Sequence, residues 1–510
     1  MRFLFLFFLF YYYKMGGGLI QLVSYGIENL YLSGNPEITF FKIIYRRHTN
    51  FSTEPIPQFF KNTPDFNRRV TCTISKNGDL ISDMYLYVTL PSIIKQGQNS
   101  NLTFSWTKKI GFSLIKNIEL EIGGQLIDKQ YGDWLNIWDE LYKKGSNNIR
   151  GVDKMIGNVK ELNSPSNGKN QYSVYVPLSF WFCGENGLAL PVIALQYNDI
   201  KIHVEFNKFE DCFIKSPSHY IDIDENISLF KKGEIITQEI DGVKYQGRFV
   251  DFDVLNNRIF YDNLSNNLIS YNSLVDRSKY VITGSESMYT CFPKMDTSNI
   301  LNSGESSDYF MQYPSFIDSY ILVNYIYLDT FERRRFLKSN HEYLISQLQY
   351  SGETTLVNNN VSVKIPFNHP CKEIIWRLQM DFNKKRNDVF NYTNSFDYDQ
   401  GNDIFKKGTI LLNHNERVSE RYSNYFNLIQ PFQHHNTSPS KGISSYSFSL
   451  NPTANQPSGS CNFSKIDEAK LQLHLDKLIS YKYPAKIRIY GLSYNIFRIV
   501  NGLGGLAFSN

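Results

Sequence analysis

The chain has 510 residues, of which 53 are lysine or arginine and 49 are aspartate or glutamate, so its formal charge is only +4. This length is enough for about two to four domains with a large core. So weak a charge excludes a surface built mainly to wrap nucleic acid. Aromatic residues make up 15% of the chain and charged residues 20%, a balance that favours a β-rich globular protein. The six cysteines form no CxxC pair, so neither a zinc ribbon nor a redox dithiol is indicated.

The first 14 residues, MRFLFLFFLFYYYK, form an apolar extension that allows three interpretations. The segment is too short to span a bilayer, which needs roughly 18 to 20 apolar residues. A signal peptide would use the glycines at 16–18 as its cleavage region, and a membrane-surface anchor would need a polar face that the segment lacks. The interpretation we favour is that Met15 is the true start and that residues 1–14 are translated upstream sequence.

Alternating apolar and polar residues predict short β-strands along most of the chain. In residues 117–122 the apolar side chains share one face, and Gly123-Gly124 predicts a hairpin turn into residues 125–128. The same alternation predicts further strands at residues 200–206, 361–365, 376–380, 446–450, 471–475 and 487–489. Short strands separated by turns indicate antiparallel sandwiches.

Two helices are predicted on this β scaffold. Asp133 is the expected cap of a helix whose Trp134, Ile137 and Leu141 form one apolar stripe. The second helix is expected to follow Asp329 and to continue to residue 348. We interpret both as helices in the loops between strands.

The polar stretch at residues 207–318 divides the chain into two strand-rich halves, residues 15–206 and residues 319–510. It is too long for a bare connection inside one domain. Because it contains alternating segments of its own, we predict an insertion that carries strands. Residues 384–407, which are rich in Asn, Asp and Lys, predict an exposed loop in the second half.

No motif for catalysis or for cofactor binding is complete. His341-Glu342 begins like a zinc-protease helix, but position 345 is Ile where a second His is required. The glycines at 502–505 imitate a dinucleotide-binding turn, yet too few residues follow to form the helix that would receive a pyrophosphate. The chain therefore predicts no enzyme and no cofactor.

Two groups of candidate metal ligands have simpler interpretations. Asp222, Asp224 and Glu225 could hold calcium through oxygen ligands, and His434-His435 could bind a transition metal. A solvated acidic turn and solvated histidines are the expected states of the two groups. No metal site is predicted.

Two basic clusters are Arg46-Arg47-His48 and Arg333-Arg334-Arg335. Each follows a predicted strand, so we expect strand-end charges that pair with acids such as Glu332. Binding to an anionic partner is the alternative.

Five segments, in order along the chain, resemble the major capsid proteins of the nucleocytoplasmic large DNA viruses, in their amoeba- and alga-infecting branch. They are residues 16–54 (GGGLIQLVSYGIENLYLSGNPEITFFKIIYRRHTNFSTE), 181–206 (WFCGENGLALPVIALQYNDIKIHVEF), 323–347 (VNYIYLDTFERRRFLKSNHEYLISQ), 446–467 (YSFSLNPTANQPSGSCNFSKID) and 487–510 (IRIYGLSYNIFRIVNGLGGLAFSN). In the first segment, Gly34-Asn35-Pro36 predicts a turn and residues 38–45 predict a strand. Two departures from the family are the extension before Met15 and the size of the insertion.

The structural signature residues of this resemblance, called the signature residues below, are Asn35, Pro36, Phe40, Tyr45, Arg46, Arg47, His48, Trp181, Phe182, Pro191, Tyr325, Asp329, Glu332, Arg333, His341, Glu342, Asn451, Pro452, Gly459, Asn462, Gly504 and Gly505.

The resemblance implies an all-β fold of two tandem eight-stranded antiparallel jelly rolls, a double jelly roll. It also implies a homotrimeric capsomer and an icosahedral shell around an internal membrane and a DNA genome. Two sandwiches per chain, repeated three times about one axis, would give six similar units with a near-hexagonal outline. The insertion is expected on the outer, host-facing surface, where it would tune contact with glycans or accessory capsid proteins.

The partners that the resemblance implies are the chain itself, neighbouring capsomers, and penton and minor capsid proteins. The internal viral membrane and surface glycans are further candidates, and direct nucleic-acid binding is not expected. The expected location is the virion shell, after assembly in the cytoplasm of the infected cell. A minor capsid paralogue or an assembly scaffold is the alternative within this fold, and a secreted carbohydrate-binding β-sandwich protein is the alternative outside it.

Overall fold

The computed structural model describes residues 20–508 except 23, 25, 95–102, 143–148, 218, 255, 272–273, 296–303, 306–313, 396–397 and 399–400. The chain divides into two units, Met1–Asn50 and Phe51–Asn510. In the first unit, η1 (Ile27–Asn29) and α3 (Leu30–Ser33) precede a bend at Asn35 and an extended segment. The predicted strand at residues 38–45 is wrong, because these exposed residues pair with no other described strand. The extension at residues 1–14 lies outside the described residues.

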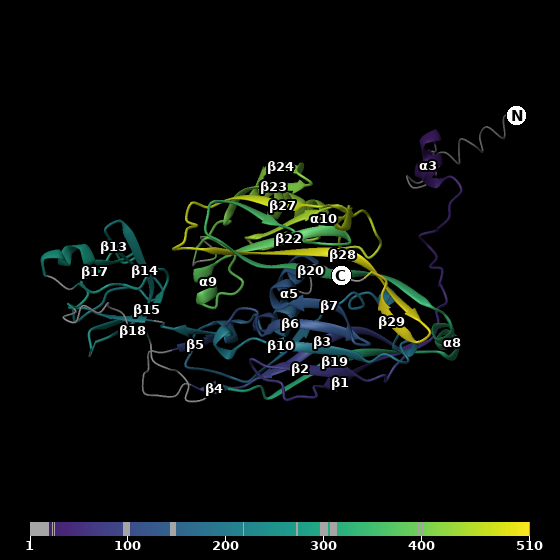
Figure 1. Ribbon diagram of the computed structural model, residues 1–510, viewed down its shortest axis with the longest axis horizontal. Helices are drawn as coiled ribbons and strands as arrows, with labels where there is room; N and C mark the ends of the chain where they lie inside the picture. Colours follow the sequence, from purple (N-terminus) through teal and green to yellow (C-terminus); the bar gives the residue numbers. More distant parts are fainter. Residues whose placement is uncertain are drawn as a thin grey trace, which may run out of the picture. The chain divides into compact units, whose positions relative to one another are not determined.

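Two four-stranded sheets form the N-terminal jelly roll, in the lower part of Figure 1. Their strands, in sheet order, are β1 (Phe51–Phe59), β19 (Asp318–Leu328), β3 (Leu80–Leu90) and β9 (Tyr172–Pro177), and then β2 (Arg69–Ile74), β10 (Ile200–Phe206), β6 (Ile115–Ile122) and β7 (Gln125–Tyr131). Alternate residues of both sheets, such as Leu86 and Ile202, fill one apolar core between them. The predicted hairpin is confirmed, because Gly123 and Gly124 have φ angles of 60° and 84° between β6 and β7.

The C-terminal jelly roll repeats this arrangement with β20 (His341–Leu356), β28 (Ala485–Val500), β22 (Pro370–Met380) and β25 (Ile443–Ser447) facing β21 (Asn360–Lys364), β27 (Ala469–Leu475), β23 (Phe405–Leu412) and β24 (Asn415–Tyr422). Two short strands, β26 (Cys461–Asn462) and β29 (Leu503–Leu506), extend the first sheet. Trp376, Leu471 and Ile487 belong to the core between the sheets. The predicted all-β fold of two tandem eight-stranded jelly rolls is confirmed.

The junction between the rolls differs from the prediction in two ways. β19 pairs with β1 and β3, so it completes the N-terminal roll although the predicted boundary placed it in the second half. Asp329 caps α8 (Thr330–Lys338) by accepting the N–H of Glu332, but the helix ends at Lys338. Residues 341–348 belong to strand β20, where they pair with β28 in an antiparallel sheet. Successive side chains therefore point to opposite faces of that sheet.

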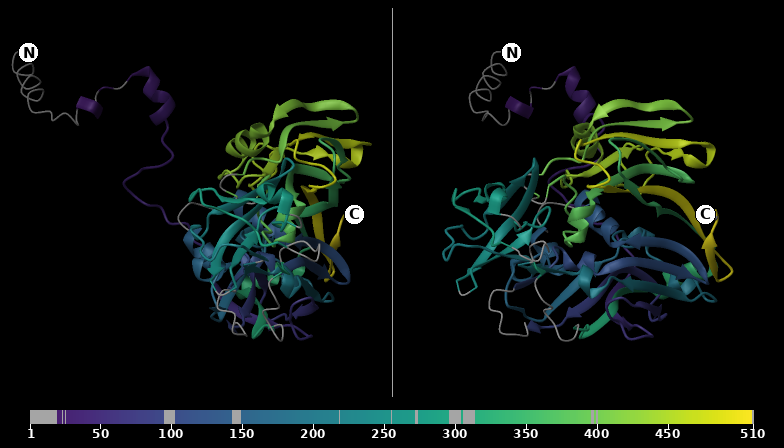
Figure 2. Two further views of the ribbon diagram at one scale, coloured as in Figure 1. Left: turned by 90° about the vertical axis from the view of Figure 1, so that its left-hand side faces the viewer. Right: turned by 60° about the vertical axis from the view of Figure 1, so that its left-hand side comes forward.

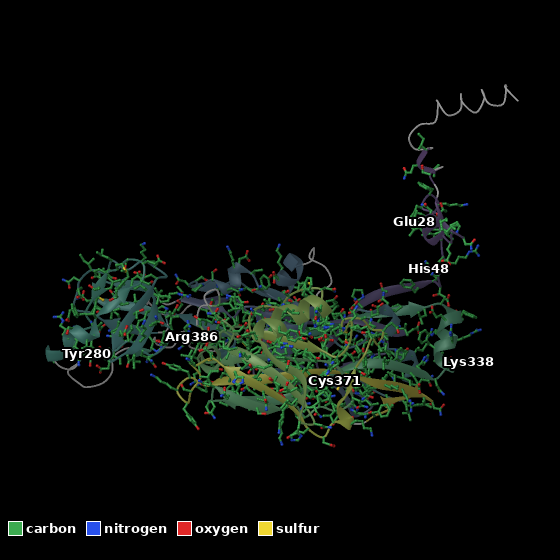
Figure 3. All side chains as sticks on the ribbon, turned by 90° about the horizontal axis from the view of Figure 1, so that it is seen from above. Glu28, His48, Tyr280, Lys338, Cys371 and Arg386 are labelled. Carbon is green, nitrogen blue, oxygen red and sulfur yellow. The ribbon has the colours of Figure 1, made fainter. Side chains whose placement is uncertain are left out.

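The insertion carries its own strands, as predicted. After β11 (Phe213–Ser216), which pairs with β5 (Thr103–Trp106), comes a seven-stranded sheet in the order β17 (Thr290–Cys291), β16 (Ile282–Gly284), β13 (Ile235–Ile240), β14 (Val243–Asp253), β15 (Arg258–Asn263), β12 (His219–Asp222) and β18 (Gly304–Glu305). A separate apolar core that includes Ile221, Phe249 and Ile259 holds it together. The views of Figures 1 and 2 place this sheet at one end of the rolls. In Figure 3 Tyr280, the last residue of the insertion's segment η6 (Leu274–Tyr280), lies at the opposite end from Lys338 of α8.

The remaining elements are short. The α-helices are α4 (Ile110–Ser113), α5 (Gly132–Tyr142), α6 (Ile149–Met155), α7 (Lys160–Asn163), α9 (Asp381–Lys385) and α10 (Gln430–His434). The 3-10 helices are η3 (Asn186–Leu188), η4 (Val192–Ala194), η5 (Phe209–Asp211), η6 (Leu274–Tyr280) and η8 (Phe463–Lys465), and η7 (Tyr425–Ile429) is a π-helix. Two further strands, β4 (Ile93–Ile94) and β8 (Gly168–Lys169), pair with each other. Within the described ranges, no helix combines the length and the apolar character needed to cross a membrane.

Candidate functional site: the seam between the two rolls

The two rolls meet along α5 and β7 on the N-terminal side and β20, β22 and β28 on the C-terminal side, a region called the seam below. Its apolar part joins Trp134 and Ile137 of α5 to Ile375, Tyr392 and Tyr490 of the C-terminal roll. The predicted apolar stripe of α5 is therefore confirmed, and its function is to attach one roll to the other. Burial of large aromatic side chains favours this contact by about 25 cal/mol for each Å² of apolar surface removed from water.

A buried ionic cluster crosses the seam beside these rings. Asp133, in the first turn of α5, accepts hydrogen bonds from Arg377 of β22 and from Arg488 of β28, the latter with an Nη1–Oδ2 distance of 2.6 Å. The Arg377 side chain is only 1% exposed. Because an unpaired buried charge is costly, both arginines must reach Asp133 for the rolls to close. These two ion pairs therefore favour one relative placement of the two rolls.

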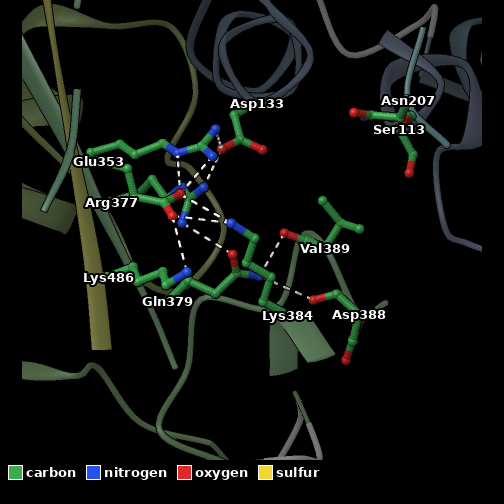
Figure 4. A network of polar contacts seen from close by, with 11 residues as sticks. Ser113, Asp133, Asn207, Glu353, Arg377, Gln379, Lys384, Asp388, Val389 and Lys486 are labelled. Atoms are coloured by element: carbon green, nitrogen blue, oxygen red, sulfur yellow. Dashed lines mark hydrogen bonds and ion pairs between the residues drawn. The ribbon is translucent and has the colours of Figure 1, made fainter. Parts of the chain in front are cut away.

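Glu353 of β20 extends the cluster toward solvent, and Figure 4 shows its carboxylate with Lys384 and Lys486, which both pair with it. Its carboxylate lies 2.6 Å from Nη2 of Arg488 and 3.0 Å from Nζ of Lys384. Burial raises the pKa of Glu353, but Arg488 and Lys384 outweigh burial and hold the pKa at about 2. Burial also acts on Asp133, and its two arginines outweigh it and lower that pKa too. The carboxylates therefore stay ionised at neutral pH.

Hydrogen bonds from side chains join β7 to β20 elsewhere in the seam. Asp128 of β7 is buried and accepts the backbone N–H of Leu348 at 3.2 Å. The side chain of Gln347 donates to the Ile127 carbonyl and accepts from Asn495 at 2.7 Å. Burial raises the pKa of Asp128 to about 6, although the hydrogen bonds to its carboxylate oppose the change. Asp128 is thus a seam carboxyl that titrates near neutral pH.

The helix α8 connects the rolls and brings several signature residues together. Arg333 Nε lies 3.1 Å from Oδ1 of Asp79, whose other oxygen accepts the Leu328 N–H at 2.9 Å. His341 Nε2 contacts the Phe336 carbonyl at 2.7 Å, which ties the end of α8 to the start of β20. Glu342 pairs with Arg498 on β28. The expected pairing of the second basic cluster is confirmed for Arg333, with Asp79 as the acid.

Signature residues at the chain's C-terminal end contact those near residue 190. The ring of Trp181 lies 5.6 Å from that of Phe497. A Cβ on Gly504 would lie 2.5 Å from Cδ2 of Leu195, so any larger residue would force the buried Leu195 side chain to move. Gly505 passes close to Gln125 of β7. This second contact fixes the tail of the C-terminal roll to the N-terminal roll.

Other signature residues serve single elements. Phe182 and Pro191 are buried in the N-terminal roll, where Tyr325 donates from its hydroxyl to the Ser75 carbonyl. In the loop after β25, the Asn451 N–H donates to Ser458 and Asn462 caps η8. Two further signature residues, Pro452 and Gly459, lie in the same loop. The remaining signature residues are exposed in the first unit: Asn35, Pro36, Phe40, Tyr45, Arg46, Arg47 and His48.

The predicted solvation of the two histidines is wrong for His435. The His435 side chain is fully buried, and its Nε2 lies 2.9 Å from Oε2 of Glu373 on β22. Folding brings this carboxylate close although 62 positions separate the two residues. His434 is partly exposed, and its Nδ1 contacts the Leu450 carbonyl.

The acidic group in the insertion is neutralised by arginines. Arg258 donates two hydrogen bonds to Asp222, and Arg277 lies 2.9 Å from Asp224. Glu225 accepts the backbone N–H of Phe292, which directly follows strand β17. These pairings correct the expectation of a solvated turn. Among the described residues, no group of three or more His, Cys, Asp or Glu side chains could hold a metal ion.

A cavity of about 410 Å³ lies beside α8 and is lined in part by Lys76, Asp79 and Arg333. Its charged groups already have partners. Asp79 pairs with Arg333, and Nζ of Lys76 donates to the carbonyls of Leu195 and Gln196 at 2.7 and 2.9 Å. The cavity therefore belongs to the contacts around α8, the helix that connects the two rolls.

Sequence reasoning missed the ionic part of the seam. Asp133 was expected as a helix cap, and residues 384–407 were expected as an exposed loop, although Tyr392 is fully buried in the seam. One signal was available, because Arg377 is a single charge between the apolar residues Trp376 and Leu378 of a strand. A charge at such a position requires a buried partner.

Comparisons with known proteins cover both rolls. A family model of the major capsid protein N-terminus matches residues 39–247, and one of the large eukaryotic DNA virus major capsid protein matches residues 332–505. The "Probable capsid protein 4" of Acanthamoeba polyphaga mimivirus is 42% identical over 97% of this chain and 100% of the relative. The major capsid protein of Phaeocystis pouchetii virus is 33% identical with the same coverage.

Solved structures agree with these matches. A quasi-atomic model of the PBCV-1 virus capsid has a TM-score of 0.62 at 26% identity and covers 92% of this chain and 100% of its own. The Faustovirus major capsid protein has a TM-score of 0.66, with 93% and 94% coverage, and at 12% identity it shows the fold alone. The likeness extends over both rolls.

Proposed function

This chain belongs to the large eukaryotic DNA virus major capsid protein family, and on that premise we propose that three copies form a capsomer whose outline is nearly hexagonal. It is a structural protein of the virion shell, where it assembles with other capsomers into an icosahedral capsid. Three copies would present six jelly rolls around one axis, and hexagonal units tile a surface.

The observation that supports this proposal is the seam. A tile must keep its two rolls in one relative placement, because a change at the seam would alter the outline that neighbouring capsomers meet. The buried cluster of Asp133, Arg377 and Arg488 and the glycine contact at Gly504 provide that constraint. In this proposal the chain works through shape and contact area, without catalytic chemistry.

Further partners belong to the same proposal. Penton and minor capsid proteins would contact the capsomers at their margins, and the internal membrane and surface glycans are candidates on the two sides of the shell. Assembly in the host cytoplasm is also part of this proposal. The insertion has its own core and lies at one end of the rolls, where an added domain leaves the roll sheets intact. We place it on the outer surface on this ground.

A minor capsid paralogue is the second candidate. One virus, Acanthamoeba polyphaga mimivirus, has both a "Probable capsid protein 4" at 42% identity and a "Capsid protein 1" at 28% identity to this chain. Several related capsid proteins can thus belong to one virus. Abundance separates the two candidates, because the major shell protein should dominate the mature particle. The secreted carbohydrate-binding alternative has no support among these relatives.

The test is to express residues 15–510, measure the mass in solution and image single particles. We expect a mass three times that of the chain and particles with hexagonal profiles. Monodisperse monomers at micromolar concentration would contradict the proposed capsomer.

A further inference from the structure

Cys371 and Cys461 lie directly opposite each other on two neighbouring antiparallel strands. The ladder between β22 and β26 pairs Pro370 with Asn462 and Cys371 with Cys461. Opposite residues of an antiparallel pair have Cα atoms about 4.5 to 5.5 Å apart, and a disulfide needs about 4.4 to 6.8 Å. The backbone therefore already holds the two cysteines at a separation that a disulfide can bridge.

The two side chains also lie on the same side of the sheet. Cys371 is fully buried in the core of the C-terminal roll, and Cys461 packs against that core. Both are free thiols, and Sγ of Cys371 donates to the Glu373 carbonyl at 3.0 Å. A thiol is a weak hydrogen-bond donor, so little is lost when Cys371 turns from this carbonyl toward Cys461.

The other four cysteines, all in the described part of the chain, have no cysteine opposite them. The two in β2 and β17 face apolar residues across their ladders. The remaining two, Cys183 and Cys212, lie outside the strands. With six cysteines among 510 residues, a direct register of two of them would rarely arise by chance.

The cysteine pair lies at the weaker of two attachments of one loop to β22. The loop at residues 448–460 begins after β25, which pairs with five residues of β22, and ends at β26, which pairs with two. A bond between Cys371 and Cys461 would secure the end that has two pairs. Because it would also join positions far apart in the sequence, it would remove many conformations from the unfolded chain and stabilise the folded one.

We propose that Cys371 and Cys461 form a redox site, which closes to a disulfide when glutathione disulfide is the oxidant. Cys461 is partly exposed, so its thiolate attacks one sulfur of the oxidant first. The oxidant's S–S bond breaks, one glutathione leaves, and a mixed disulfide forms on Cys461. The Cys371 thiolate then attacks the Cys461 sulfur and expels the second glutathione. Each cysteine gives up one proton, and the two electrons reduce the oxidant to two thiols.

Burial makes this reaction slow at neutral pH. It raises the pKa of Cys461, and Arg417 opposes the change. Burial also raises the pKa of Cys371, and the nearby Cys461 raises it further. Because the thiolate is the reacting form, closure should become faster as the pH rises. A reducing compartment keeps the pair as thiols, and an oxidising one favours the disulfide.

The experiment uses the full chain, first reduced and then incubated with glutathione disulfide at about pH 8. Remaining thiols are alkylated, and mass spectrometry of a non-reduced tryptic digest detects linked peptides. Trypsin releases Cys371 in residues 365–372 and Cys461 in residues 442–465, and neither peptide contains another cysteine. We expect these two peptides to be linked in more than about half of the chains. The melting temperature should be at least about 3 °C above that of the reduced chain.

Cys461→Ser should abolish both the linked peptides and the rise in melting temperature. Cys183→Ser is the matched control, because Cys183 is the other partly exposed cysteine, and this variant should keep both effects. A glutathione adduct on Cys461 without a link to Cys371, or a link between the Cys461 residues of two chains, would overturn the inference. If Cys461→Ser fails to fold, the reduced and oxidised forms of the unaltered chain still decide the question.

This test is separate from that of the proposed function. The linked peptides come from one chain, so their formation does not require a capsomer. Absence of the link from a trimeric chain would overturn the redox site and leave the proposed capsomer standing.

Discussion

At the scale of single residues, the seam depends on charges that have no route to water. Arg377 is 1% exposed and Asp133 is 6% exposed, so neither can be solvated if its partner is lost. Burying a paired charge is close to neutral in free energy, whereas leaving one partner unpaired costs about 3 to 5 kcal/mol. The buried cluster therefore adds little net stability, and its main effect is to favour one relative placement of the two rolls.

Replacing Arg377 by methionine should destabilise the chain by about 3 kcal/mol, because buried Asp133 then loses one of its two arginine partners and keeps only Arg488. Denaturant unfolding measures the change in the free energy of unfolding. Arg498→Met is the matched control, since Arg498 is 51% exposed in its pair with Glu342, and its loss should cost less than about 1 kcal/mol. Adding Asp133→Asn to Arg377→Met should recover part of the stability. Equal losses from Arg377→Met and Arg498→Met would contradict this account.

Asp128 should make the stability of the seam depend on pH. Burial raises the pKa of Asp128 to about 6 from the ordinary aspartate value of 3.8, so the folded chain holds the proton more tightly than the unfolded chain. The resulting stabilisation is fully present below about pH 4 and is lost as the pH rises to about 6, with a total near 3 kcal/mol. Asp128→Asn should remove this dependence.

The measurement is thermal unfolding of wild type and variant at intervals between pH 4 and pH 7.5. The two stability curves should diverge across pH 4 to 6, with the wild type losing the additional stability. Asp199→Asn, at an exposed aspartate, is the control and should leave the slope unchanged. Parallel curves for Asp128→Asn and wild type would show that Asp128 does not titrate in this range.

At the scale of elements, the insertion is joined to the rolls by two neighbouring strands. β12 and β18 pair with each other, with His219 opposite Glu305, so the points where the chain enters and leaves the sheet are adjacent. Adjacent strands lie about 4.8 Å apart. The insertion also has polar contacts with the C-terminal roll, such as the one from Asn266 to the Tyr483 hydroxyl at 3.2 Å.

Deleting residues 219–305 and joining residues 218 and 306 by a short Gly-Ser linker should leave both rolls folded. The sheet that is removed has its own core, and the strands of the rolls keep all their partners. Circular dichroism and light scattering of residues 15–510 with and without this deletion measure the effect. We expect both rolls to remain folded and the number of chains per particle to stay the same, with a mass that is lower by the deleted segments. Loss of trimers after the deletion would place the insertion in the subunit contact and refute its assignment to the outer surface.

At the scale of the whole molecule, the chain consists of two units with very different burial. Phe51–Asn510 contains both roll cores, whereas none of the described residues from 20 to 50 is buried. Removing residues 1–50 should therefore leave the melting temperature of the remainder within about 2 °C of the full chain. Differential scanning calorimetry measures it. A fall of more than about 5 °C would show that the first unit contributes to the folded body.

The sequence by itself determined the local elements and the family. The alternation at residues 200–206 is strand β10, and Gly123-Gly124 is the turn between β6 and β7, because strand faces and tight turns depend on a few adjacent residues. The five capsid-like segments likewise needed only their order along the chain. The same local reasoning failed at residues 38–45, where an apolar alternating segment has no partner strand among the described residues.

Only the tertiary structure decided which distant segments meet. β19 joins β1 and β3, and Arg377 reaches Asp133 across 244 positions of the chain. Neither contact produces a periodic pattern in the sequence. Each depends on which distant segments the fold brings together and on the burial that results. The seam is therefore a property of the assembled sheets, and no short stretch of the sequence contains it.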